Sequence, residues 1–279
     1  MFKRLLTKFH TASPAVKASM AMLFANVILK GFSFLSGPIF TRLMPTEQYG
    51  LVSTFTSWQS LLSVFFTLNL SQGVYNNGML DYKDHRNEFQ FSLYAITSII
   101  TISLFIVFCC FTDQIVLILE LPIQYIVIMF IYFLFIPAYQ FWVGRQRYEY
   151  KYKALVCITI SIAFFSLGFG IIAVLLSDVS NVAMTRIITM EGVNIVVGIF
   201  FSILLAVKAK FKIRLEYCKY ALKFNIPLIP HYLSMYVLSS SDRIMISRMV
   251  NHTATAIYSV AYTVASVISI VWQSIESSL

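Results

Sequence analysis

Long apolar stretches alternate with short polar ones along the whole chain. Three of the apolar stretches carry no Asp, Glu, Lys or Arg: Phe91–Phe111, Ala154–Ser177 and Thr253–Ile275. A helix rises about 1.5 Å per residue, so roughly 20 residues cross the hydrocarbon core of a bilayer, which is about 30 Å thick. Each of the three stretches is long enough to cross. The pattern therefore predicts an all-α protein that spans the membrane several times.

The same alternation predicts about eight transmembrane helices packed as a polytopic bundle. Loops with basic and turn-forming residues separate them. The predicted helices are Ala18–Thr41, Gln48–Leu70, Phe91–Phe111, Gln114–Trp142, Ala154–Ser177, Ile187–Val207, Phe224–Val250 and Thr253–Ile275.

Composition excludes an ordinary water-soluble domain. Hydrophobic residues make up 58% of the chain and charged residues 12%, and the mean hydropathy is +0.77. Soluble domains usually carry about 25% charged residues. The net charge of +9 is typical of nucleic-acid-binding proteins, but it has a simpler source in the loops between the helices.

The basic residues predict the orientation in the membrane. With the N-terminus in the cytoplasm, sixteen of the 21 Lys and Arg residues fall in cytoplasmic segments and four at outer helix ends, and Lys30 lies within the first helix. Cytoplasmic loops of membrane proteins are enriched in Lys and Arg. We therefore expect a multi-pass membrane protein with a cytoplasmic N-terminus and no nucleic-acid partner. Binding of RNA by these loops is the less favoured alternative.

A short motif recurs along the chain. Thr41–Met44 followed by Ser53 aligns with Ser247–Val250 followed by Ser259, at a constant offset of 206 residues. An even number of predicted helices separates the two copies, so they share one orientation, as in a parallel repeat. The repeat predicts a six-helix lobe over residues 1–215 and the first two helices of a second lobe over residues 216–279. We accordingly expect a truncated second lobe.

The first helix carries a polar face at mid-membrane. Asn26, Lys30, Ser33, Gly37 and Thr41 are spaced by three or four residues and so share one side of the helix. A charged side chain at the centre of a membrane helix costs about 2.5–3.5 kcal/mol on insertion scales. Either Lys30 pairs with a carboxylate of a neighbouring helix, or it faces a water-filled path for an anionic substrate, and the two are compatible. Asn26 and Lys30 are candidate path residues.

A second stripe lies in the sixth predicted helix, where Glu191, Asn194, Gly198 and Ser202 follow one face. Two interpretations of Glu191 remain open. The carboxylate reaches water at the outer interface, or it serves as a partner of Lys30 or as a proton-coupling site.

The seventh predicted helix carries two prolines followed by His231, Asp242 and Arg243. His231 either titrates near neutral pH, or it packs within the protein with its hydrogen bonds made. Asp242 and Arg243 are adjacent, so they project about 100° apart on a helix. We expect one of them to meet another helix and the other to reach the outer interface, rather than both meeting one partner.

No catalytic motif is present in the sequence. It holds no Walker A loop, no dinucleotide-binding glycine motif, no nucleophile elbow and no HExxH pair, and its four histidines are scattered. We therefore predict no catalytic residue, no metal site, no cofactor and no enzymatic activity.

Four segments resemble a known family: Pro38–Gly50 (PIFTRLMPTEQYG), Asn225–Leu233 (NIPLIPHYL), Ser240–Ile246 (SSDRIMI) and Ala256–Ser259 (AIYS). They are similar to the bacterial polysaccharide flippases, the O-antigen and capsule translocases of the multidrug/oligosaccharidyl-lipid/polysaccharide exporter superfamily. The resemblance is specific in these segments and extends to the hydropathy of the whole chain.

The resemblance implies two pseudo-symmetric six-helix lobes around a cationic cavity. In this family the cavity holds the diphosphate and sugars of an undecaprenyl-linked oligosaccharide. Alternating access carries the headgroup across the inner membrane for lipopolysaccharide or capsule synthesis. Lys30 matches the expected cation. Arg42, Asp242 and Arg243 fall on motif positions, where gating or structural contacts are expected. The implied partners are the lipid-linked oligosaccharide, membrane lipids and the polysaccharide polymerase machinery.

Three rival functions remain open. A drug/cation antiporter of the same superfamily would need a cavity centred on a carboxylate, whereas the charge predicted at mid-membrane is Lys30. A membrane-embedded enzyme would need clustered catalytic groups in a large outer loop, and the predicted outer loops are short. An inactive transporter fragment is the third.

Overall fold

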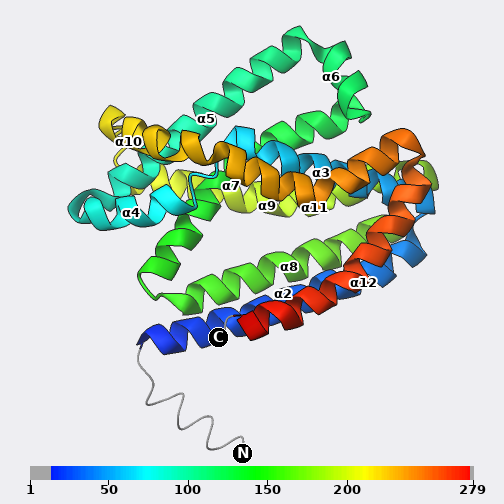
Figure 1. Cartoon of the computed structure of the whole chain (residues 1–279), viewed down its shortest axis with the longest axis horizontal. Helices are drawn as coiled ribbons and strands as arrows, with labels where there is room; N and C mark the ends of the chain where they lie inside the picture. The colour runs from blue at the N-terminus through cyan, green and yellow to red at the C-terminus, as the bar shows by residue number, and fades with distance from the viewer. Residues whose placement is uncertain (1–13, 277–279) are drawn as a thin grey trace, which may run out of the picture.

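The protein is a bundle of long helices (Figure 1). A computed structural model describes residues 14–276, with side chains described from residue 20 to residue 266 except at residue 23. Eight long helices occur at the eight predicted places, which confirms the all-α fold. The N-terminus predicted to be cytoplasmic lies outside the described residues. The long helices are α2 (Pro14–Leu43), α3 (Thr46–Thr67), α5 (Arg86–Cys110), α7 (Ile123–Tyr148), α8 (Tyr152–Leu176), α9 (Val182–Lys208), α11 (Ile229–Met249) and α12 (His252–Glu276).

Five of these helices are long and apolar enough to cross a membrane, by length and composition, within the described residues. They are α2, α5, α7, α8 and α9, so the chain is a multi-pass membrane protein. The other three long helices, α3, α11 and α12, are also long enough to span. α11 is more polar because it carries Asp242, Arg243 and Arg248.

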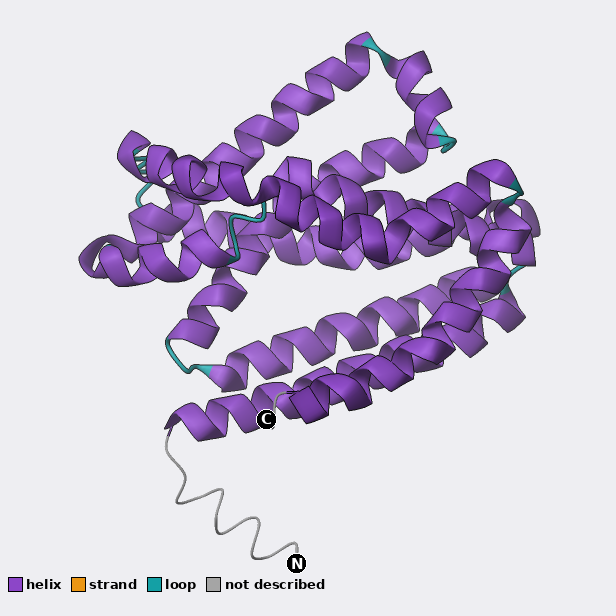
Figure 2. Ribbon diagram, viewed as in Figure 1, coloured by secondary structure: helices purple, strands orange, loops and turns teal. Residues whose placement is uncertain are grey.

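Three short helices lie between the long ones, and the apolar pattern does not predict them. They are α4 (Gly73–Asp81), α6 (Thr112–Leu119) and α10 (Leu215–Asn225). Single 3₁₀ turns occur at Lys83–His85, Val179–Asn181 and Ile226–Leu228. In the part of the chain that the structure describes there is no strand (Figure 2).

The helix predicted at Gln114–Trp142 is wrong at its start. α6 ends at Leu119, and Glu120 adopts the left-handed conformation with a φ of 53°. Pro122 precedes α7, and a proline disfavours helical geometry in the residue before it. A charged residue and a proline thus divide the apolar run into a short helix and a long one.

The helices form two groups that meet through α9. α2 packs along α8, and α8 packs on α9, while α7 packs along α9 and α3 contacts both α11 and α12. In Figure 1, α3, α7, α9 and α11 lie together, and α2 and α8 lie together beside them. Within the first group Phe66 of α3 stacks on Phe133 of α7 with ring centroids 4.5 Å apart. Lipid is as apolar as these side chains, so close packing rather than water exclusion holds such helices together.

Gly50 permits the closest contact between α3 and α12. A Cβ at this position would lie 1.7 Å from the carbonyl oxygen of His252, the first residue of α12. Two further bonds tie the same junction. The imidazole Nδ1 of His252 lies 3.3 Å from the hydroxyl of Thr54 and 3.0 Å from that of Ser247. Glycine at position 50 therefore lets the backbones of the two helices touch.

Pro38 lies inside α2, and it lacks the N–H that would donate to the carbonyl one turn earlier. The carbonyl that loses this donor is that of Phe34. One turn later the Thr41 hydroxyl donates to the carbonyl of Gly37, at 2.9 Å. α2 thus continues as one helix through the proline to Leu43.

Candidate functional site

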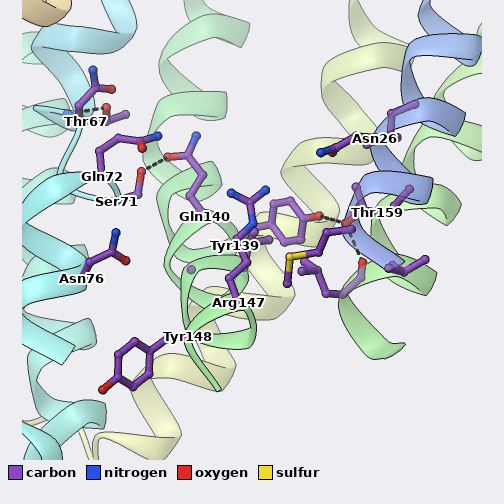
Figure 3. A pocket seen from close by; sticks show the side chains of 18 of the residues that line it. Asn26, Thr67, Ser71, Gln72, Asn76, Tyr139, Gln140, Arg147, Tyr148 and Thr159 are labelled. Carbon is purple, nitrogen blue, oxygen red and sulfur yellow. Dashed lines mark hydrogen bonds between the residues drawn. The ribbon is translucent and has the colours of Figure 1, made fainter. Parts of the chain in front are cut away.

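A cavity with a volume of about 590 Å³ lies between α2, α3, α4, α7, α8 and α11 (Figure 3). Its lining is rich in amide and hydroxyl side chains. The polar lining residues are Asn26, Ser63, Thr67, Asn69, Ser71, Gln72, Asn76, Tyr139, Gln140, Arg147, Tyr148, Thr159 and Tyr236.

Arg147 is the charged residue of this lining, which holds no Asp or Glu. It lies in the last turn of α7, where a cation also suits the helix dipole. Figure 3 shows its guanidinium between Gln72 and Asn76 on one side and Asn26 and Thr159 on the other. The cavity therefore carries a net positive charge and suits an anionic ligand.

Hydrogen bonds across helices hold two walls of the cavity in place. The hydroxyl of Tyr139 on α7 lies 3.1 Å from that of Thr159 on α8. On the other side Ser71, in the turn after α3, donates to Oε1 of Gln140 at 3.4 Å. Amides and hydroxyls both donate and accept hydrogen bonds, which is the chemistry of sugar hydroxyls. The site can thus bind a ligand that combines hydroxyl groups with negative charge.

Asn26 is the predicted path residue that lines this cavity. Lys30 follows one turn later on α2 and is exposed, outside the cavity lining. Among the residues that the structure describes, no carboxylate lies within ion-pair distance of Lys30. The pairing of Lys30 with a neighbouring helix is therefore absent from this structure.

Glu191 lies in the interior of the bundle, with 2% of its surface exposed. Asn194 donates to its Oε2 at 3.2 Å. An interfacial carboxylate would be exposed, so that interpretation is wrong. Glu191 does not line the cavity either, and it forms no ion pair in the described part of the chain.

Arg186 precedes Glu191 on α9 and is also buried, although the charge pattern places it at an outer helix end. Its guanidinium lies 4.0 Å from the ring centroid of Phe40 and donates to the carbonyl of Ser166 at 3.1 Å. α9 thus uses an arginine to join α2 and α8, a role that the sequence alone does not indicate.

Asp242 and Arg243 both meet α12, through two different tyrosines, so the expectation that only one of them meets another helix is wrong. The hydroxyl of Tyr258 donates to Oδ2 of Asp242 at 2.6 Å, and the guanidinium of Arg243 lies 4.4 Å from the ring centroid of Tyr262. Residues four apart lie on one face of a helix. The two tyrosines therefore present adjacent partners, and the two charged side chains are long enough to reach them.

The remaining predicted residues, Arg42 and His231, are exposed and lie outside the cavity lining. Arg42 ends α2, and His231 is near the start of α11. Their proposed roles stay predictions.

The second cavity, of about 440 Å³, lies between α2, α3 and α12. Its lining is mostly apolar and contains no charged residue. The lining residues are Thr41, Thr46, Tyr49, Ala256, Ile257, Val260 and Ala261.

Sequence reasoning missed Arg147 because it assigned that residue to a basic cytoplasmic loop. A signal was available in the spacing of Gln140, Gly144, Arg147 and Tyr148, which share one face of α7 and all line the cavity. This stripe continues past Trp142, where the predicted helix ends, to the observed end of α7 at Tyr148. A search for polar residues at helical spacing would have found it.

One comparison with known proteins identifies a family. The model of a family described as polysaccharide biosynthesis protein matches residues 15–279, which is nearly the whole chain. No curated protein and no solved structure matches the chain. The resemblance found in the four sequence segments is thereby confirmed.

Proposed function

Because the chain belongs to the polysaccharide biosynthesis protein family, we propose that it translocates an undecaprenyl-diphosphate-linked oligosaccharide across the bacterial inner membrane. The transport proceeds by alternating access and supplies O-antigen or capsule synthesis. The observation that carries the proposal is the polar cavity of about 590 Å³, with Arg147 as the charge of its lining.

The headgroup occupies this cavity in the proposed complex. The guanidinium of Arg147 binds the diphosphate, because its planar fork matches phosphate oxygens in pairs. The amides of Asn26, Gln72 and Gln140 bind sugar hydroxyls, and Tyr139 supplies an aromatic face for a sugar ring. The isoprenoid chain remains among the lipids.

Lys30 is the second cation on the proposed path. It lies on the same face of α2 as Asn26 and one turn further along. We propose that it meets the phosphates as the headgroup leaves Arg147. Arg42 contributes to gating in this proposal, and Asp242 and Arg243 hold α11 to α12.

Glu191 is the proposed candidate for coupling transport to protons, since it is a carboxylate buried within the helix bundle, and His231 remains a candidate residue of the path. The lobe boundary near residue 215 is likewise a proposal. α10 begins there, and the two helices that follow it, α11 and α12, pack on α3 of the first lobe.

The test is the substitution of Arg147 in a strain that lacks its own flippase. The chain is expressed with Arg147→Ala or Arg147→Lys, and surface polysaccharide is measured at equal protein level in the membrane. Loss of a charged hydrogen bond of about 1.5–3 kcal/mol predicts a roughly tenfold to hundredfold decrease for Arg147→Ala. Arg147→Lys retains part of the export, because the charge remains.

Lys153→Ala is the matched control, because Lys153 is exposed near the start of α8 and does not line the cavity. Unchanged export by Arg147→Ala contradicts the role of the cavity. If the parent chain itself restores no polysaccharide, the inactive fragment is favoured instead. Co-purification with the polymerase tests the proposed partner.

A drug/cation antiporter is less well supported. A carboxylate in the binding site favours an organic cation, whereas the lining of the polar cavity contains no carboxylate and carries the positive charge of Arg147. Export of a cationic dye by the purified and reconstituted protein would favour this rival.

A further inference from the structure

The segment Lys208–Lys223, which leads from the end of α9 through most of α10, is strongly basic. It carries six basic residues against one acidic residue, Glu216. The basic residues are Lys208, Lys210, Lys212, Arg214, Lys219 and Lys223. Arg214 bonds to Glu88, and Lys212 lies 3.9 Å from the same carboxylate. The other four are exposed lysines that form no ion pair within the described residues.

Large apolar side chains alternate with the basic ones at the start of this segment. Phe211 is 70% exposed, Ile213 is 55% exposed and Leu215 is 68% exposed. The segment follows directly on α9, one of the candidate membrane spans, so it leaves the bilayer at its surface. Exposed apolar residues beside lysines are typical of segments that lie in the membrane interface.

The segment is held in a defined position by its other face. Tyr217, Cys218 and Ala221 of α10 are buried, and α10 packs against α4 and α5. The backbone N–H of Arg214 donates to Oγ of Ser92 at 2.9 Å, and the hydroxyl of Tyr220 donates to Asp81 at 2.8 Å. The basic and apolar side chains are therefore presented by a fixed scaffold.

We propose that the segment Lys208–Lys223 is a binding surface for anionic phospholipid. Phe211, Ile213 and Leu215 insert between lipid headgroups, and the exposed lysines contact the headgroup phosphates. Positive charge at a membrane surface attracts anionic lipid. A soluble acidic partner would match the lysines but would leave the apolar side chains without a hydrocarbon environment.

The test places the whole chain in lipid nanodiscs of phosphatidylcholine with a variable fraction of phosphatidylglycerol. Phe211→Trp introduces a fluorophore at the surface. Its emission is obtained by subtracting the fluorescence of the parent protein, which carries only the other tryptophans, from that of the variant. Brominated phosphatidylglycerol or brominated phosphatidylcholine is the quencher. We expect quenching by the brominated anionic lipid at a lower mole fraction than by the zwitterionic one.

Lys210→Gln with Lys219→Gln, made in the Phe211→Trp protein, should raise the mole fraction of phosphatidylglycerol for half quenching by up to about thirtyfold, the combined effect of two lysines at about 1 kcal/mol each. The matched control is Lys83→Gln with Lys153→Gln, two exposed lysines outside the segment, and it should change little. Equal quenching by both lipids overturns the proposal. So does quenching by aqueous iodide in place of lipid, which would favour a soluble partner.

Discussion

The two cavities along α2 differ in what they can bind. Asn26 lines the polar cavity and Thr41 lines the apolar one. The two residues are roughly 22 Å apart along the helix axis at 1.5 Å per residue. The first cavity offers amides and Arg147, whereas the second offers hydroxyls and apolar side chains alone. One helix thus borders a polar site that contains a positive charge and a site that lacks any charged group.

The helices around the two cavities are also held together differently. Near the polar cavity, side chains bond across helices, as where the buried hydroxyl of Tyr75 donates to the carbonyl of Phe141 at 2.7 Å. Near the apolar cavity, backbones come into direct contact at Gly50 and His252. The contrast indicates that the helices around the polar cavity are sensitive to loss of hydrogen-bonding groups. The helices around the apolar cavity are sensitive to an increase in side-chain volume.

The largest expected effect comes from a substitution to tryptophan that fills one cavity or the other with an indole ring. Ala25→Trp places it in the polar cavity and Ala261→Trp in the apolar one. We expect polysaccharide export to decrease more than about tenfold for Ala25→Trp, equal to about 1.4 kcal/mol. The decrease should stay within about twofold, or about 0.4 kcal/mol, for Ala261→Trp. Equal losses of export by the two variants, at equal amounts of protein in the membrane, would show that the two cavities do not differ in function.

Gly50→Ala should be the most destabilising of the small changes. The added methyl group would overlap the carbonyl oxygen of His252 and force α3 and α12 apart, at a cost of about 1–3 kcal/mol. Thermal unfolding of the protein in detergent measures this effect. Gly31→Ala is the control, because no atom lies within 4 Å of the added Cβ. If both changes left the midpoint unaltered, the tight contact would be excluded.

Removal of one hydroxyl tests the junction of α11 and α12. Tyr258→Phe deletes the hydrogen bond to Asp242 and should lower the free energy of unfolding by about 1 kcal/mol. Tyr262→Phe retains the ring that faces Arg243 and should have a smaller effect. Amide hydrogen exchange in α11 reports the difference. Faster exchange in Tyr262→Phe than in Tyr258→Phe would reverse the expected order.

The smallest expected effect is a pH dependence at the α7–α8 turn. Burial of Glu149 acts to raise the pKa of its carboxyl. Hydrogen bonds from Lys151 and Arg145 and the charges of these residues outweigh burial, so the pKa lies below its ordinary value of 4.5. The contribution of Glu149 to stability is therefore complete above pH 4.5 and is lost as the pH falls through the lowered pKa.

Hydrogen exchange at this turn, measured in detergent at decreasing pH, should show the loss in the parent protein. Glu149→Gln should remove the pH dependence in this range. A pH profile that is identical in parent and variant would exclude the ionised Glu149 as its source.

Much of the fold follows from the sequence, because lipid leaves few alternatives to a helix for an apolar run that crosses the membrane. Ala154–Ser177, for example, agrees with α8 to within two residues at each end. The same reasoning failed where local backbone chemistry decided the outcome. The predicted helix Gln114–Trp142 runs across Glu120 and Pro122, whereas in the structure a left-handed residue and a proline end one helix and begin another there.

The candidate site was only partly predictable. Asn26 was found because its face of the helix is polar at mid-membrane, but Arg147 was not, since a charge near the end of a helix looks like part of a loop. The burial of Glu191 and Arg186 depends on which neighbouring helices pack against α9, and one helix's sequence does not contain that information. The pairing of Asp242 and Arg243 with α12 depends likewise on tyrosines sixteen and nineteen positions away.

Pro38 lies between Asn26, which lines the polar cavity, and Thr41, which lines the apolar one. Because the proline removes one link of the hydrogen-bond ladder, the helix is softest in bending there. A swing of the segment before Pro38 can therefore change the width of the polar cavity, while the segment after it borders the apolar cavity with α3 and α12. The polar cavity can in this way open or close without a matching movement of α2 at the apolar cavity.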